Sequence, residues 1–155
     1  MIYKLYTDGA TSNNGYDNAR GGYAYAIVAN DKLIHADYQL IVPATNNICE
    51  LMAIITGCEN ILSSMEIDDV VLVYSDSAYC MNCYKQQWYK KWQTNGWKNS
   101  KKEPVANKEL WEKLIPFFES PNFKFEKVKG HSAGTTENEK WNNYVDKLAV
   151  RAREG

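Results

Sequence analysis

The run Val70-Val71-Leu72-Val73-Tyr74-Ser75-Asp76 decides the fold of this chain. Its first five residues are apolar or aromatic and follow one another without a charge, which is typical of a central strand covered on both faces. Such a strand needs helices above and below its sheet, so the run favours an α/β fold. It ends on an acidic residue, at the point where the backbone leaves the core.

The pattern on either side of this run predicts a mixed sheet. Residues 2–8, 23–29 and 32–42 have the composition of strands, with Asn30-Asp31 as a hairpin turn. Phe123, Phe125 and Val128 alternate with charges as a half-buried strand that ends near Gly130-His131. Helical spacing of apolar residues predicts helices over 47–64, 77–84, 87–94, from Asn107 onward, and at the C-terminus. Three meandering strands followed by crossover units indicate a five-stranded mixed sheet with helices on both faces.

Four acidic residues stand in distinct settings along this plan. Asp8 ends the first strand, Glu50 lies in the first turns of the 47–64 helix, Asp76 closes the central strand, and Asp146 lies on the last helix. Carboxylates that converge repel one another unless cations lie between them. The four residues therefore predict a divalent-metal site, and carboxylates that hold two metals are a common device for cutting phosphodiesters.

Composition and charge narrow the class of protein. The 155 residues are 45% hydrophobic and contain no linker, so we expect one compact domain over residues 1–155. No apolar run is long enough for a membrane span, and the N-terminus enters a strand pattern rather than a secretory signal. We therefore expect a cytoplasmic monomer that does not associate with membranes, and we expect Cys49, Cys58, Cys80 and Cys83 to be reduced.

One stretch of the chain is strongly basic although the chain as a whole is nearly neutral in charge. The formal net charge is −1, but the segment from Lys85 to Lys102 holds six lysines and no acid, interleaved with Trp88, Trp92 and Trp97. Lysines combined with aromatic side chains favour a nucleic-acid-binding face. The competing interpretation is a helix whose lysines are solvated and whose tryptophans fill the core.

The chain resembles type 1 ribonuclease H, the endonuclease that cuts the RNA strand of RNA–DNA hybrids. The resemblance covers nearly the whole sequence and rests on six motifs in the family's order. These are Tyr6-Thr7-Asp8-Gly9, Gly21-Gly22-Tyr23, Thr45 to Ala53, Ser75-Asp76-Ser77, Val128-Lys129-Gly130-His131 and Asn142 to Ala149. The resemblance implies a ribonuclease H-like fold with the sheet order 3-2-1-4-5, and a basic handle over residues 85–105.

The resemblance also implies a two-metal mechanism that yields 5′-phosphate and 3′-hydroxyl ends. Residues at the positions of Asp8, Glu50, Asp76 and Asp146 bind two Mg²⁺ ions in the family, and Mn²⁺ is an alternative ion. The Asp8 position bridges both metals, and the Asp146 position shares the metal that activates water. The Glu50 and Asp76 positions hold the metal at the leaving oxygen. His131 matches a mobile histidine that moves protons or helps the product leave.

Substrate contacts follow from the same resemblance. The positions of Asn46 and Asn47 contact the minor groove of the hybrid, and Thr45 helps to seat a phosphate of the DNA strand. One asparagine of the Asn13-Asn14 pair joins that pocket, and the sequence leaves open which one. Trp88 and the handle lysines grip the DNA strand. The lysines assigned to this role are Lys90, Lys91 and Lys98.

The sequence departs from the family at a few positions, and two other functions compete. Ala78 stands where a glutamine is common, Asn143 where a glutamate is usual, and the loop between His131 and Asp146 is longer than expected. The first competing function is a structure-specific DNA nuclease of the same fold, a class that shares the clustered carboxylates but lacks the Thr45-Asn46-Asn47 helix start and the basic handle. The second is a catalytically silent hybrid-binding module, against which the presence of all four acids argues.

Overall fold

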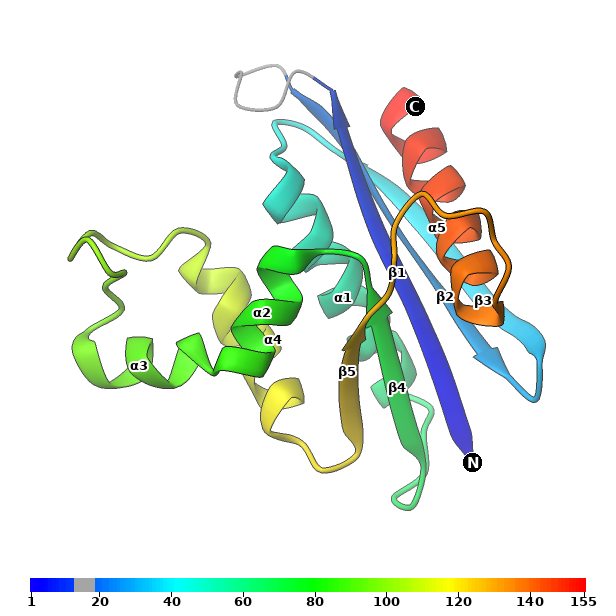
Figure 1. Cartoon of the computed structure of the whole chain (residues 1–155), viewed down its shortest axis with the longest axis horizontal. Coiled ribbons are helices and arrows are strands. Elements are labelled where there is room, and N and C mark those ends of the chain that lie inside the picture. Colours follow the sequence, from blue (N-terminus) through cyan, green and yellow to red (C-terminus); the bar gives the residue numbers. More distant parts are fainter. Residues whose placement is uncertain (13–18) are drawn as a thin grey trace.

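The computed structural model describes residues 1–12 and 19–155 (Figure 1). The chain forms β1 (Ile2–Ser12), β2 (Arg20–Ala29), β3 (Lys32–Ile41), α1 (Asn46–Leu62), β4 (Val70–Ser75), α2 (Ala78–Gln86), α3 (Trp88–Asn95), α4 (Lys108–Glu119), β5 (Phe123–Lys127) and α5 (Glu137–Glu154). The strands form one sheet in the order β3-β2-β1-β4-β5. The predicted fold class and strand order are therefore confirmed.

The sheet combines an antiparallel meander with parallel crossovers. β1 pairs antiparallel with β2, and β2 with β3. β1 pairs parallel with β4, and β4 with β5. Asn30 and Asp31 both adopt positive φ, at 53° and 62°, which is the geometry of the tight turns that match the twist of a hairpin.

The first two strands are longer than predicted. The sequence pattern ended the first strand at Asp8, whereas β1 continues to Ser12 because it keeps pairing with β2 up to Ser12 opposite Arg20. Its pairing with β4 stops earlier, at Thr7 opposite Ser75. β1 therefore projects beyond β4, and the polar composition of residues 9–12 hid a strand that has a partner on one side only.

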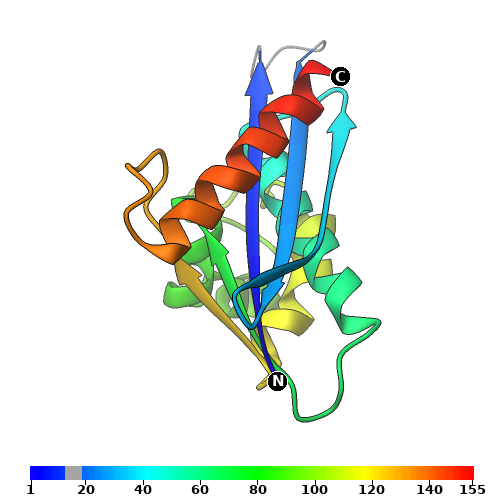
Figure 2. The same ribbon diagram turned by 90° about the vertical axis from the view of Figure 1, so that its right-hand side faces the viewer.

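Helices cover both faces of the sheet (Figures 1 and 2). α5 crosses one face, and Figure 2 shows it in front of the strands, with α1 and α4 behind them. Alternate residues of β1 serve the two layers: Leu5 packs in the cluster with Leu51 and Trp111, while Tyr6 packs with Val145 of α5. The core thus lies in two layers, one on each side of the sheet.

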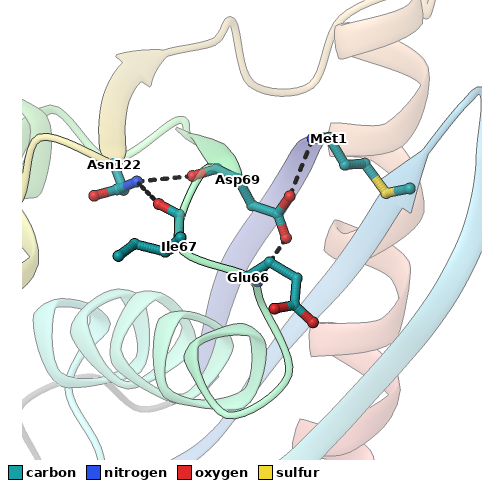
Figure 3. A network of polar contacts seen from close by, with 5 residues as sticks. All are labelled: Met1, Glu66, Ile67, Asp69 and Asn122. Atoms are coloured by element: carbon teal, nitrogen blue, oxygen red, sulfur yellow. Dashed lines mark hydrogen bonds and ion pairs between the residues drawn. The ribbon is translucent and has the colours of Figure 1, made fainter.

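A polar network ties the start of β1 to the start of β4 (Figure 3). The Asp69 carboxylate accepts from the amino group of Met1 at 3.0 Å and from the amide of Glu66 at 2.7 Å. The Asn122 side chain donates to the carbonyls of Ile67 and Asp69. Asp69 therefore holds together two parallel strands and the turn before β4.

Two expectations from composition are answered in the part of the chain that the structure describes. Its helices include none that combines the length and the apolar composition of a bilayer span. All four cysteines are free and buried, as predicted.

Candidate metal centre

Parallel pairing of β1 and β4 places two of the predicted acids side by side. Thr7 and Ser75 form the last residue pair between these strands, and Asp8 and Asp76 are the residues that follow them. The Thr7 hydroxyl donates to the carbonyl of Tyr74 at 3.0 Å, which fixes the spacing at this level. The expectation that Asp8 and Asp76 are neighbours is confirmed, although Asp8 lies within β1 and not at its end.

α1 supplies the third acid from the other side of β1. Thr45 caps this helix by accepting from the amide of Ile48 at 3.1 Å, and Glu50 follows one turn later. The backbone amide of Gly9 donates to both Glu50 Oε1 and Asp8 Oδ1, each at 2.9 Å. One N–H group therefore fixes two carboxylates that belong to different elements.

The close approach of β1 and α1 depends on Gly9 having no side chain. A Cβ atom at this position would lie 2.6 Å from Cys49 Cβ and 2.8 Å from the backbone nitrogen of Glu50. Both distances are shorter than real Cβ contacts, so only glycine allows the helix start to lie against the strand. The sequence analysis quoted Gly9 inside a motif but assigned it no part in the site.

The three carboxylates form a compact donor set for a divalent cation. One oxygen each from Asp8, Glu50 and Asp76 lies within 4.8 Å of the others. Burial raises the pKa of Asp8, and the charges of Glu50 and Asp76 raise it further; burial and the charge of Asp76 likewise raise the pKa of Glu50. Glu50 Oε2 is buried and has no hydrogen-bond partner within residues 1–12 and 19–155. A cation would relieve both the repulsion and this unpaired oxygen, so the residues fit a metal.

Asp146 and His131 lie beside this set. Asp146 is outside the group whose oxygens lie within 4.8 Å of one another, but its side chain is close enough to Asp8 to contribute to the raised pKa of Asp8. His131 Nδ1 lies 3.8 Å from Asp146 Oδ2, and the histidine side chain is 81% exposed. The loop between β5 and α5 therefore brings His131 to the edge of the centre.

Gly130 brings the β5–α5 loop onto Asp76. A Cβ atom at Gly130 would lie 2.6 Å from Asp76 Oδ2. The amide of Val128 donates to the carbonyl of Ser75 at 2.9 Å and so anchors the start of the loop at the same strand end. The loop that carries His131 therefore lies directly against a carboxylate of the donor set, and no local sequence pattern predicts this contact.

The proposed substrate-binding residues at the start of α1 are polar and accessible. Asn46 and Asn47 are exposed, and the Asn46 side chain accepts a hydrogen bond from the Thr11 hydroxyl. Thr45 precedes them as the helix cap. The other two asparagines of this prediction, Asn13 and Asn14, lie outside the described residues.

The handle carries a groove on one flank of α3. A cavity of about 550 Å³ is lined by Trp88, Lys91, Trp92, Asn95, Lys98, Asn99 and Ser100. Trp92 links this groove to the core, because the centroid of its ring lies 5.4 Å from the ring centroid of the fully buried Trp111. Lys90, predicted to act with Lys91 and Lys98, instead lines a separate cavity together with Lys85. The structure therefore separates the three predicted lysines into two groups.

A mixed sheet in this order, with acids on its first strand and directly after its fourth strand, is typical of a class of carboxylate-based metal-dependent nucleases. The ribonuclease H family matches residues 2–154. Ribonuclease H of Clostridium botulinum strain Hall is 41% identical over 150 residues, which cover 96% of this chain and 93% of that protein. Ribonuclease H of Caldicellulosiruptor saccharolyticus is 42% identical, covering 94% and 91%. This chain belongs to the ribonuclease H family.

Solved structures agree on the fold. The solution structure of the PFV RNase H domain superposes with a TM-score of 0.80 at 23% identity, covering 98% of this chain and 94% of that one. LC11-RNase H1 in complex with RNA/DNA hybrid superposes with a TM-score of 0.68 at 22% identity, covering 98% and 96%. Both show that the arrangement of strands and helices seen here is that of ribonuclease H domains.

Proposed function

We infer that this protein is a hydrolytic endoribonuclease that cuts the RNA strand of RNA–DNA hybrids. One observation carries the inference: Asp8, Glu50 and Asp76 converge within 4.8 Å in a chain that matches the ribonuclease H family over residues 2–154. A relative of the same fold is described in complex with an RNA/DNA hybrid, which supports the substrate. We propose that residues 1–155 act as one domain; the cytoplasmic location and the monomeric state stay predictions.

We propose Mg²⁺ as the ion, with two ions held by Asp8, Glu50, Asp76 and Asp146. Mg²⁺ prefers oxygen ligands and retains water, which suits a set made only of carboxylates beside a substrate phosphate. When bound, the ions lower the pKa of the attacking water and stabilise both oxygens of an in-line displacement. The protein keeps the carboxylates in place through the Gly9 amide, which holds Asp8 and Glu50 at fixed positions.

His131 is proposed as the group that exchanges protons at the edge of the centre. Its ring is exposed and lies 3.8 Å from Asp146, so a proton can pass between the ring and solvent without unfolding the loop. An imidazole ring can accept a proton on one nitrogen and donate one from the other, which suits this task.

Recognition of the hybrid is proposed to use two separate surfaces. Asn46 and Asn47 offer amide groups at the start of α1, where a 2′-hydroxyl of the RNA strand can be sensed and Thr45 can seat a phosphate. Trp88, Lys91 and Lys98 line a basic and aromatic groove suited to the backbone of the DNA strand, and Lys90 adds charge on the other flank.

The test is cleavage of matched labelled substrates. RNA–DNA hybrid, duplex DNA and duplex RNA of one sequence are incubated with the protein, with Mg²⁺ or with chelator, and the product ends are mapped. We expect Mg²⁺-dependent internal cuts in the RNA strand of the hybrid alone, with 5′-phosphate and 3′-hydroxyl ends. Preference for duplex DNA would contradict the inference, and so would hybrid binding without any cutting.

A further inference from the structure

Asn142 on α5 is a buried side chain whose polar atoms have no partner. It is 1% exposed, and neither Oδ1 nor Nδ2 makes a hydrogen bond to any residue that the structure describes. Burying an amide in this way is unfavourable, because the group gives up its hydrogen bonds to water. Such groups are rare in native proteins, and one explanation for them is a role in a functional site.

Contacts between α5 and β1 locate this amide. Tyr6 donates to Asn138 Oδ1 at 2.5 Å, and Arg153 Nη1 donates to the carbonyl of Thr11 at 3.2 Å. Residue numbers rise together along the two elements, so the helix and the strand run in the same direction across this face, as Figure 2 also shows. The contact at each end therefore fixes which part of α5 lies over which part of β1.

Asn142 consequently lies at the level of Asp8. It is one turn beyond Asn138, an advance of about 6 Å along the helix. Asp8 is two residues beyond Tyr6, an advance of about 6.8 Å along the strand, and strand residues two apart share a face. Asp146 is one further turn along the same side of α5, and its side chain is close enough to Asp8 to contribute to the raised pKa of Asp8. The unpaired amide is thus flanked by two of the four carboxylates.

An amide is well suited to this place. A lysine here would bring a positive charge that competes with a cation, and an aspartate would add another negative charge to a set that already repels itself. The N–H groups of an asparagine can donate to a carboxylate without changing the charge of the site. Groups that orient metal-binding carboxylates in this way are a recurring part of metal centres.

We propose that Asn142 is a positioning residue of the metal centre: its Nδ2 amide orients the carboxylates of Asp8 and Asp146 when they hold a cation. This inference rests on the proposed function. According to this proposal, the unpaired amide destabilises the cation-free protein, and it strengthens cation binding in the loaded protein. A residue that only supported the packing of α5 would not affect cation binding.

The experiment compares variants at Asn142 with a matched neighbour. Asn142→Leu removes the amide at similar size, Asn142→Ala serves if the leucine variant does not fold, and Asn142→Ser retains a donor. Asn143→Ala is the control, because the Asn143 side chain donates to the carbonyl of Ser132 at 3.1 Å instead of being unpaired. Thermal melting is followed in chelator and through a Mg²⁺ titration, and kcat and KM are measured on the hybrid.

The amide-free variants should melt no lower than wild type in chelator. The Mg²⁺ concentration that gives half of the full rise in melting temperature, called the Mg²⁺ midpoint below, should be about 10–100-fold higher for these variants than for wild type. This is the usual effect of losing a residue that orients a metal ligand. Their kcat should fall while KM for the hybrid stays unchanged, and the serine variant should recover part of both losses. Asn143→Ala should leave the Mg²⁺ midpoint at the wild-type value.

Two results would overturn the proposal. A lower melting temperature in chelator with an unchanged Mg²⁺ midpoint would make Asn142 a packing residue only, and wild-type behaviour in every measurement would leave the amide without a role. If wild type itself showed neither a Mg²⁺-dependent shift nor cleavage, the proposed function would fail first, and this inference with it. Wild-type cleavage beside unaffected Asn142 variants would remove this inference alone.

Discussion

At the scale of single residues, Asp8 is proposed to bind the metal, but its buried carboxyl group destabilises the cation-free protein at neutral pH. Burial and the charges of Glu50 and Asp76 raise its pKa, so the folded chain keeps a proton that the unfolded chain releases. The stability associated with this group is therefore complete below the ordinary carboxyl pKa of about 4, and it is lost as pH rises towards the folded-state value. The cation-free protein therefore has a lower free energy of unfolding at neutral pH than it would have without this buried acid.

Asp8→Asn should therefore stabilise the cation-free protein while abolishing cleavage. In chelator at neutral pH we expect the free energy of unfolding to rise by about 1–3 kcal/mol, because asparagine has no proton to take up on folding and removes the cost of keeping the buried carboxyl group protonated. Denaturant unfolding at neutral pH and again near pH 4 measures this, and the difference should shrink at the lower pH. A variant that cuts the hybrid at the wild-type rate in Mg²⁺ would refute the role of Asp8 in metal binding.

Gly9→Ala should damage both the fold and the centre. The added methyl group meets Cys49 and the backbone of Glu50, which cannot move aside as a flexible side chain could. We expect a loss of about 1–3 kcal/mol in the free energy of unfolding, together with slower cleavage, because α1 must shift away from β1. Gly96→Asn is the control, since that position has φ +78°, a region that asparagine tolerates, and nothing within 4 Å.

At the scale of elements, the handle should contribute charge to binding and nothing to chemistry. Replacing Lys91 and Lys98 together by alanine should lower the slope of log affinity against log salt by about 2, one for each lost phosphate contact. Binding of the hybrid by the Asp8→Asn background, measured across salt concentrations, tests this. The charge-matched pair Lys32→Ala and Lys113→Ala, on β3 and α4, should leave the slope unchanged.

The network around Asp69 makes the joining of β1 and β4 sensitive to acid. Hydrogen bonds from the Glu66 amide and from the Met1 amino group lower the pKa of Asp69. Its stabilising effect is therefore present above the ordinary carboxyl pKa and is lost as pH falls through the folded-state value. Asp69→Asn should melt below wild type at neutral pH and converge with it near pH ~3; parallel melting curves at all pH values would contradict this.

The elements themselves could be predicted wherever one local pattern decided them. The apolar run of β4 and the helical spacing in α1 each carried a single interpretation, and parallel pairing then brought Asp8 and Asp76 together. The extension of β1 to Ser12 depends on its partner β2, which no local pattern encodes. The contact of Gly130 with Asp76 and the separation of Lys90 from Lys98 likewise arise only from packing between distant segments.

At the scale of the whole molecule, binding of a cation should raise the free energy of unfolding of the entire domain. Any ligand that binds only the folded chain adds about 2.7 kcal/mol at one hundred times its dissociation constant. For a protein of this size that corresponds to a rise of roughly 6–10 °C in melting temperature. Calorimetry in chelator and in increasing Mg²⁺ measures it, and the apparent affinity should weaken as pH falls, because protons compete for the carboxylates. A melting temperature independent of Mg²⁺ would argue against the centre.

The route of α5 across the sheet also bears on protein synthesis. The chain leaves the ribosome N-terminus first, so the segment that brings Asp146 and covers Tyr6 is made after every strand is complete. A nascent chain that stops before Glu137 already contains three of the four acids but lacks the helix that closes over them. The proposed four-carboxylate centre therefore cannot be completed during synthesis until α5 has emerged from the ribosome.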